Sequence, residues 1–215
     1  MPDANLRIRT VYADAHLLVL NKPAGLLSVP GKGADKQDCL SARVQKIYPD
    51  ALIVHRLDMA TSGLMLMARG AVVQTALSKL FELRAILKRY VAVVDGHMLQ
   101  SADWQVIDLP IALDWPNRPL RIVQADGKPS QTRWRALLHD SAANTTRVEL
   151  EPITGRSHQL RVHLNALGRP IVGDCLYAPL DMQAKSTRLL LHASALQFMH
   201  PAGGERMAFE NAPEF

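Results

Sequence analysis

Short β-like runs separated by turn residues constrain this chain most strongly, because they recur from one end of the sequence to the other. The strongest is the continuous apolar run at residues 64–68, which is typical of a buried strand. The other β-like runs lie at residues 6–20, 86–94, 104–109, 120–123, 132–138, 146–150, 188–195 and 207–210. The sequence therefore predicts a large sheet.

Three segments instead repeat apolar residues at helical spacing: residues 39–47, 71–84 and 160–167. Gly168 and Pro170 mark the end of the third helix. No linker-like stretch, low-complexity segment or repeat of fixed period interrupts the chain. We therefore expect one α+β domain over residues 1–215, with a large mixed, mainly antiparallel sheet flanked by helices and loops.

Charge and cysteine content narrow the classes of protein that fit. The 25 Lys and Arg residues exceed the 20 Asp and Glu residues, giving a net charge of +5 that favours polyanionic partners. Cys39 and Cys175 form no CxxC pair, so the sequence indicates neither a disulfide framework nor a zinc cluster. Residues 1–10 lack the apolar core of a signal peptide, and no segment reads as a membrane span. We expect a cytoplasmic protein with no membrane partner.

Several common catalytic motifs are absent. The chain contains no G-x-G-x-x-G, no P-loop, no H-E-x-x-H and no G-x-S-x-G sequence. Nucleotide cofactors, zinc hydrolysis and serine esterase chemistry therefore lose their usual sequence support.

The segment around Asp58 is the first candidate for chemistry. Asp58 lies between Arg56 and a Thr61-Ser62-Gly63 turn, just before the apolar run at residues 64–68. Such a segment places a carboxylate at the end of a sheet. Local spacing leaves two interpretations open, a catalytic acid and the commoner structural acid paired with Arg56.

The segment from Thr154 to Arg161 is the second candidate, at the start of the third predicted helix. A helix N-terminus with Arg156 and Arg161 close by suits an anion, although a solvated first turn with two unrelated arginines remains open. His158 and His163 are five residues apart, so a packed or hydrogen-bonded role is favoured over a shared metal.

Two further segments suit RNA. Lys88-Arg89-Tyr90 combines cations with an aromatic ring that either stacks on a nucleobase or packs in the core of the sheet. The tract from Trp115 to Arg135 is strongly basic, which fits an RNA-facing surface or an ordinary solvated face. Its basic residues are Arg118, Arg121, Lys128, Arg133 and Arg135.

Taken together and in order, five motifs resemble those of the RluA-type RNA pseudouridine synthases. They are NKPAGLL from Asn21, HRLDMATSGLMLMAR from His55, KRY from Lys88, TGRSHQLRVH from Thr154 and LLLHA from Leu189. The resemblance runs over nearly the whole chain and implies the pseudouridine synthase fold. It also implies an isomerase that converts uridine in RNA to pseudouridine and needs neither cofactor nor metal.

The resemblance also implies roles for particular residues. Asp58 is expected to be the essential aspartate, Tyr90 to pack on the target uracil, and Arg161 to pair with Asp58. Arg56 is expected to enter the RNA where the base leaves its stack. Further RNA contacts are expected at Lys22, Thr61, Lys88, Asn117, Arg118, Arg156 and His158.

Because Asn21 lies close to the N-terminus, the chain resembles a short branch of the family without an appended N-terminal RNA-binding domain. The segment from Asp114 to Pro119 supports this similarity. The branch modifies an anticodon-loop uridine of tRNA and a hairpin-loop uridine of 23S rRNA. We therefore expect tRNA and large-subunit rRNA stem-loops as partners, no obligatory protein partner, and a monomer.

Two other functions use the same residues. A nucleobase-releasing glycosidase could use Asp58 and Tyr90, although glycoside hydrolysis usually needs two carboxylates and the motif segments hold no second one. A non-catalytic RNA-binding module would use the basic tract and would not need Asp58. Release of free uracil would indicate the first, and tolerance of Asp58→Asn the second.

Overall fold

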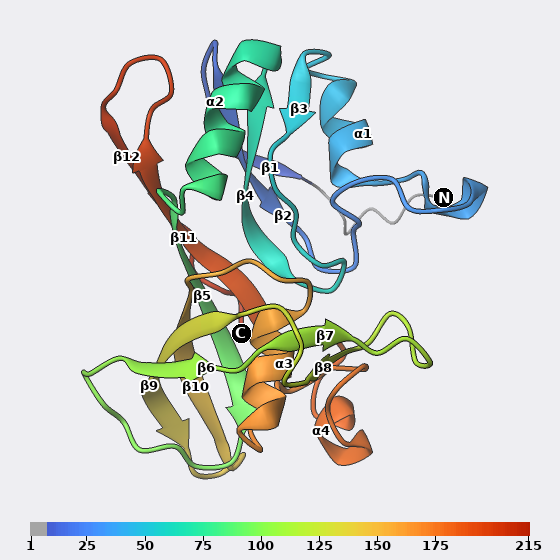
Figure 1. Ribbon diagram of the computed structural model, residues 1–215, viewed down its shortest axis with the longest axis vertical. Coiled ribbons are helices and arrows are strands. Elements are labelled where there is room, and N and C mark those ends of the chain that lie inside the picture. The colour runs from blue at the N-terminus through green and yellow to red at the C-terminus, as the bar shows by residue number, and fades with distance from the viewer. Residues whose placement is uncertain (1–7) are drawn as a thin grey trace. The chain divides into compact units, whose positions relative to one another are not determined.

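The computed structural model describes residues 8–215, which form two compact units (Figure 1). Among the described residues, the first unit comprises residues 8–88 and His192–Glu214, and the second comprises Arg89–Leu191 and Phe215. The single domain expected over residues 1–215 stays a prediction, because compact units of one chain can belong to one domain or to two.

The first unit is built on a sheet with the strand order β1-β2-β4-β11, in which β3 also pairs with β4 and β12 with β11. The strands are β1 (Arg9–Ala13), β2 (Leu17–Lys22), β3 (Ala51–Ile53), β4 (Ser62–Arg69), β11 (Leu191–Met199) and β12 (Arg206–Glu210). β4 and β11 pair in parallel, whereas the other pairs in this unit are antiparallel. The mixed, mainly antiparallel α+β fold predicted from the sequence is confirmed.

Period-two alternation along β4 builds the core of the first unit. Leu64, Leu66 and Ala68 pack with Leu77 of helix α2 (Ala71–Glu82). The intervening Met65 and Met67 are also fully buried, which explains why the sequence shows a continuous apolar run. Figure 1 shows α2 lying along the sheet, with helix α1 (Leu40–Gln45) beside β3. A short 3-10 turn, η1 (Ala34–Lys36), lies in the loop before α1.

The second unit pairs its strands in the order β5-β10-β9-β6, all antiparallel. The strands are β5 (Leu87–Asp95), β6 (Gln105–Asp108), β9 (Gln131–Asp140) and β10 (Thr145–Pro152). A separate hairpin joins β7 (Ile111–Leu113) to β8 (Arg121–Val123). Helix α3 (Gln159–Ala166) contacts β8, β9 and β10, and a short helix α4 (Leu180–Ala184) follows.

The register of β5, β10 and β9 assigns side chains to the two faces of the second sheet. Leu150 lies opposite both Tyr90 and Trp134, so these three residues share one face. The neighbouring positions on the other face carry ion pairs between arginines and glutamates, and the Trp104 ring lies 4.8–5.5 Å from three guanidinium groups. The ion-paired residues are Arg89, Arg133, Arg135, Glu149 and Glu151.

Most of the segments predicted as strands or helices are strands or helices in the structure. The short strands β3 and β7 and the short helix α4 were not predicted from the sequence. The part of the first predicted run at residues 6 and 7 lies outside the described residues. Within residues 8–215, no helix is both long enough and apolar enough to cross a membrane.

Candidate active site

Hydrogen bonds to the backbone hold the loop that carries Asp58 on both sides of this residue. Before it, the Leu57 N–H donates to Ser28 Oγ at 3.1 Å, and the Ser28 hydroxyl donates to Leu57 O at 2.7 Å. After it, Met59 O accepts from the Gly25 N–H at 2.9 Å and from Lys22 Nζ at 3.1 Å. The NKPAGLL motif and its continuation therefore support the HRLD motif, and Asp58 lies on a fixed segment of chain.

Lys22 is fully buried although it is charged. Its ammonium group also donates to Pro23 O and Leu26 O, both at 2.8 Å, so carbonyl oxygens replace the water that burial removes. These bonds give Lys22 a structural role in the Asp58 loop. The RNA contact expected of Lys22 stays a prediction.

Replacing Ser28 with alanine is expected to lower the free energy of unfolding by about 2 kcal/mol, because both buried backbone groups of Leu57 lose their partner. Urea denaturation measures this change. The control is Ser78→Ala on the exposed side of α2, which is expected to alter stability by less than about 0.5 kcal/mol. Equal losses of unfolding free energy in the two variants would mean that the Ser28 hydroxyl does not stabilise the backbone of Leu57.

The turn after Asp58 leads directly into β4 and contacts β11. The Thr61 N–H donates to Asp58 O at 3.1 Å, closing the turn. Ser62 Oγ is 2.8 Å from His192 Nδ1, and the other ring nitrogen of His192 contacts Asn211. The LLLHA motif therefore fixes the first residues of β4, which follow the candidate carboxylate.

His55 supports the loop that carries Asp58, a role that was not predicted from the sequence. Its Nε2 accepts the Leu66 N–H at 2.9 Å, and its ring stacks on Phe81 with the centroids 4.5 Å apart. Burial and the charge of Lys88 lower the pKa of His55 to about 3, so the ring stays neutral near pH 7 and keeps its acceptor. Burial lowers the pKa of Lys88 as well. His55 thus ties the HRLD motif to the middle of β4.

The residues predicted around Asp58 differ in exposure. Arg56 is exposed, Asp58 is half-buried and Thr61 is buried. Lys88 is half-buried, with its Nζ 5.9 Å from the centroid of the Phe81 ring. The RNA contacts expected of Arg56, Thr61 and Lys88 stay predictions.

In the second unit, Arg161 lies in the first turn of α3 and is 4% exposed. Its Nε donates to Asp174 Oδ2 at 2.8 Å and its Nη2 to Asp174 Oδ1 at 2.6 Å. Its guanidinium carbon lies 5.0 Å from the centroid of the Tyr177 ring. Neither partner of Arg161 was predicted from the sequence. The pair expected between Arg161 and Asp58, and the uracil contact expected of half-buried Tyr90, stay predictions.

The predicted anion site at the start of α3 has its own internal partners. The Arg156 N–H donates to Gln159 Oε1 at 3.0 Å, and the exposed guanidinium of Arg156 lies near Pro129 O. His163 contacts Thr132 Oγ1 and Leu109 O through its two ring nitrogens, which confirms its packed, hydrogen-bonded role. Within residues 8–215, no group of three or more His, Cys, Asp or Glu side chains could hold a metal ion.

The loop of the β7–β8 hairpin carries the predicted RNA contacts Asn117 and Arg118, both exposed. The Asp114 carboxylate accepts from the backbone and the side-chain amide of Asn117, at 3.3 and 3.0 Å. The Arg118 guanidinium lies 4.8 Å from the centroid of the exposed Trp115 ring. The loop therefore presents an arginine and an aromatic ring together on its surface.

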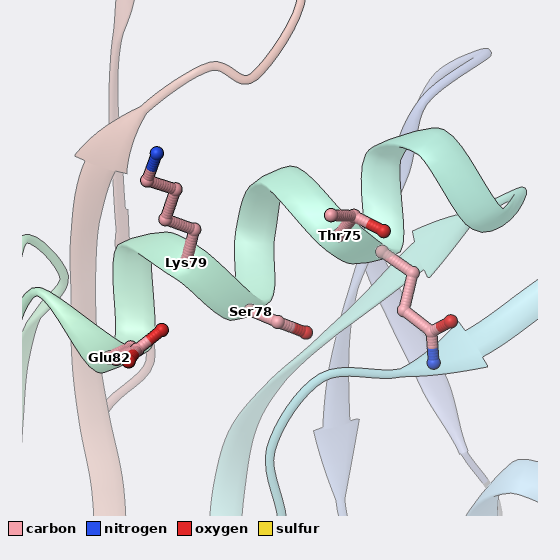
Figure 2. A pocket seen from close by; sticks show the side chains of 5 residues that line it. Thr75, Ser78, Lys79 and Glu82 are labelled. Carbon is pink, nitrogen blue, oxygen red and sulfur yellow. The ribbon is translucent and has the colours of Figure 1, made fainter.

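A hollow of ≈ 410 Å³ runs along the exposed side of α2 and holds none of the predicted site residues. Figure 2 shows that its labelled lining side chains all come from this one helix. The lining residues are Gln74, Thr75, Ser78, Lys79 and Glu82.

Comparison with known proteins places these residues in a family context. Residues 16–166, which include Asp58, Tyr90 and Arg161, match a family model described as RNA pseudouridylate synthase. The chain is 48% identical over 206 residues to the dual-specificity RNA pseudouridine synthase RluA of Escherichia coli K12, covering 95% of this chain and 93% of that protein. It is 51% identical over 195 residues to the protein of the same name from Vibrio parahaemolyticus, covering 89% and 77% of the two chains.

A solved structure shows the same fold. Human RNA pseudouridylate synthase domain containing 1 superposes with a TM-score of 0.81 and 28% sequence identity, covering 100% of this chain and 87% of the human chain.

Proposed function

This chain belongs to the RNA pseudouridylate synthase family, and we propose that it carries out the family's reaction through Asp58, Tyr90 and Arg161. The family resemblance and the fold predicted from the sequence are thereby confirmed. The protein is an RNA pseudouridine synthase, which makes it an isomerase with RNA as its partner. The glycosidase and the non-catalytic binding module find no support among the similar proteins.

The reaction sets the requirements that the site has to meet. The bond between the uracil ring nitrogen and the anomeric carbon breaks, the base turns, and a ring carbon bonds to the same anomeric carbon. The new bonding carbon loses a proton and the released nitrogen gains one, so atoms balance and there is no net oxidation. The site therefore needs a flipped-out uridine, an ionised carboxylate near the sugar, and a surface that retains the uracil.

We assign the carboxylate to Asp58, and the observation that carries this assignment is the fixed loop around it. Hydrogen bonds from Ser28 before Asp58, and from Gly25 and Lys22 after it, restrain the backbone on both sides. A reacting group needs such preorganised support. Attack on the anomeric carbon and removal of a neighbouring proton both require this carboxylate to be ionised.

Tyr90 supplies the surface that retains the uracil, and Arg161 supplies the cation that keeps Asp58 ionised. The sheet supports the first role, because the ion pairs of Arg89 on the opposite face restrain the strand that carries Tyr90. The buried bidentate pair of Arg161 with Asp174 supports the second role, since it fixes the direction of the guanidinium group.

Further residues of both units are proposed to engage the RNA. Arg56 is exposed two residues before Asp58, which suits insertion into the RNA where the base leaves. The exposed Arg118 beside Trp115 suits contact with phosphates and bases. The remaining proposed contacts are Lys22, Thr61, Lys88, Asn117, Arg156 and His158.

The proposed substrates are an anticodon-loop uridine of tRNA and a hairpin-loop uridine of 23S rRNA. Support comes from two relatives with 48% and 51% identity, both named dual-specificity RNA pseudouridine synthases. We further propose that residues 1–215 form a single catalytic domain and that the protein works as a monomer in the cytoplasm.

The test is to incubate the purified protein with bulk RNA from cells that lack it and to map pseudouridine at single-nucleotide resolution. New pseudouridine is expected at one tRNA anticodon-loop position and one 23S rRNA hairpin-loop position. Modification of only one RNA class would contradict dual specificity. Free uracil without pseudouridine would contradict the isomerase and indicate a glycosidase.

A further inference from the structure

We propose that Asp174 and Tyr177 are positioning residues, which together form a cradle that holds the Arg161 guanidinium in one orientation for the reaction. This inference rests on the proposed role of Arg161. It adds two residues that lie outside the residue 16–166 match and that local sequence spacing did not identify.

The carboxylate of Asp174 restrains both Arg161 and Tyr177. It accepts two hydrogen bonds from Arg161, at 2.8 and 2.6 Å, in the bidentate arrangement that fixes the plane of a guanidinium. Its Oδ1 also accepts the backbone N–H groups of Leu176 and Tyr177, at 3.0 and 3.2 Å. Asp174 is 1% exposed, so its carboxylate is shielded from competing water.

The ring of Tyr177 provides the second side of the cradle. The Arg161 guanidinium carbon lies 5.0 Å from the ring centroid, within the range of a cation–π contact. The Tyr177 hydroxyl accepts the Arg121 N–H at 2.9 Å and lies 2.7 Å from His158 Nδ1. These contacts at the hydroxyl stop the ring from turning away from Arg161.

The backbone at His158 links this cradle to the start of α3. His158 has φ +59°, in the left-handed region that residues other than glycine rarely adopt, immediately before the helix that carries Arg161. Strain of this kind persists only where the surroundings enforce it, and here the Tyr177 hydroxyl contacts the strained residue. Tyr177 thus contacts both the residue that precedes α3 and the guanidinium that the first turn of α3 carries.

Orientation of Arg161 matters because a charged hydrogen bond weakens steeply when its angle is lost. A guanidinium fixed on one edge by Asp174 and on one face by Tyr177 can direct its remaining donors only one way. Loss of the cradle should therefore slow the chemical step while RNA binding persists.

The experiment compares Tyr177→Leu, Tyr177→Phe and Asp174→Asn in the full chain. Single-turnover pseudouridine formation and the RNA dissociation constant are measured for each variant. We expect Tyr177→Leu and Asp174→Asn to lower the rate constant by about 100-fold, with RNA affinity close to that of the unchanged protein. Tyr177→Phe keeps the ring but loses both hydroxyl contacts, and is expected to lower the rate by about 10-fold.

The chain offers a matched control in its first unit. Arg69 pairs with Asp50 at 3.1 Å, and its guanidinium carbon lies 5.3 Å from the centroid of the Tyr48 ring. Tyr48→Leu therefore removes the same kind of contact from an arginine that has no proposed role in the reaction. Its rate constant is expected to match that of the unchanged protein.

A double-variant cycle distinguishes a residue that acts through Arg161 from one that only stabilises the fold. If the cradle acts through Arg161, then Tyr177→Leu should add little to the defect of Arg161→Lys. Additive defects, or full activity of both Tyr177→Leu and Tyr177→Phe, would overturn the cradle. Thermal unfolding shows whether each variant is folded. If Asp174→Asn does not fold, the rate of Tyr177→Phe tests the cradle instead.

Failure of the cradle can be told apart from failure of the proposed function. An unchanged rate for Arg161→Lys would mean that Arg161 has no role in the reaction itself. A slow Arg161→Lys variant beside fully active Tyr177 and Asp174 variants would keep Arg161 in the reaction and overturn the cradle alone.

Discussion

Asp58→Asn is expected to abolish pseudouridine formation, lowering the single-turnover rate by about 10⁴-fold, while RNA affinity changes little. Asparagine has nearly the same shape as aspartate, so the contacts of Ser28 with Leu57 and of Lys22 with Met59 should persist. The neutral amide can neither attack the sugar nor take up a proton. Rates are measured with a stem-loop RNA identified by pseudouridine mapping.

A control for this prediction is Asp181→Asn, which changes the net charge equally at an exposed position in the first turn of α4. It is expected to leave both the rate and the affinity unchanged. If Asp58→Asn turned over RNA as fast as this control, Asp58 would not be the essential carboxylate. If Asp58→Asn lost affinity instead of rate, its role would be binding rather than catalysis.

Gly63→Ala is expected to lower the free energy of unfolding by about 3 kcal/mol or more, through two effects that act together. Gly63 has φ +111°, which disfavours any residue with a Cβ atom. An added Cβ would also collide with backbone atoms of Ala193 on the neighbouring strand β11. The parallel pairing of Gly63 with Ala193, next to the turn after Asp58, would have to open.

The other end of the same strand provides the control. Gly70 follows β4 with φ +80°, but no atom lies within 4 Å of the position that its Cβ would take. Gly70→Ala is expected to cost less, about 1–3 kcal/mol, from the backbone conformation alone. Urea denaturation of both variants tests the difference. Equal losses would mean that close approach to Ala193 contributes nothing to stability.

Long periodic segments and ordered motifs were predictable from the sequence. The run at residues 64–68 and the stripe at residues 160–167 correspond to β4 and α3, because burial on a strand or a helix imposes its own period on the sequence. The elements β3 and β7 span too few residues to show any period, and α4 is similarly short. Pairing with neighbouring strands, rather than local pattern, determines β3 and β7.

The supporting contacts of the site were beyond local sequence reasoning. A lysine at the end of a strand usually indicates exposure, yet Lys22 is buried because three carbonyl oxygens converge on its ammonium group. Asp174 follows Arg161 by 13 positions, without a helical or strand period to relate them. Such partners are brought together by loops, whose course depends on the whole fold.

The hydrogen bonds that hold the Asp58 loop involve main-chain atoms of Leu57 and Met59, not their side chains. Met59 is 52% exposed, although its backbone is held by these hydrogen bonds. The side chain at position 59 can therefore be exchanged without removing the hydrogen bonds that hold the backbone beside Asp58.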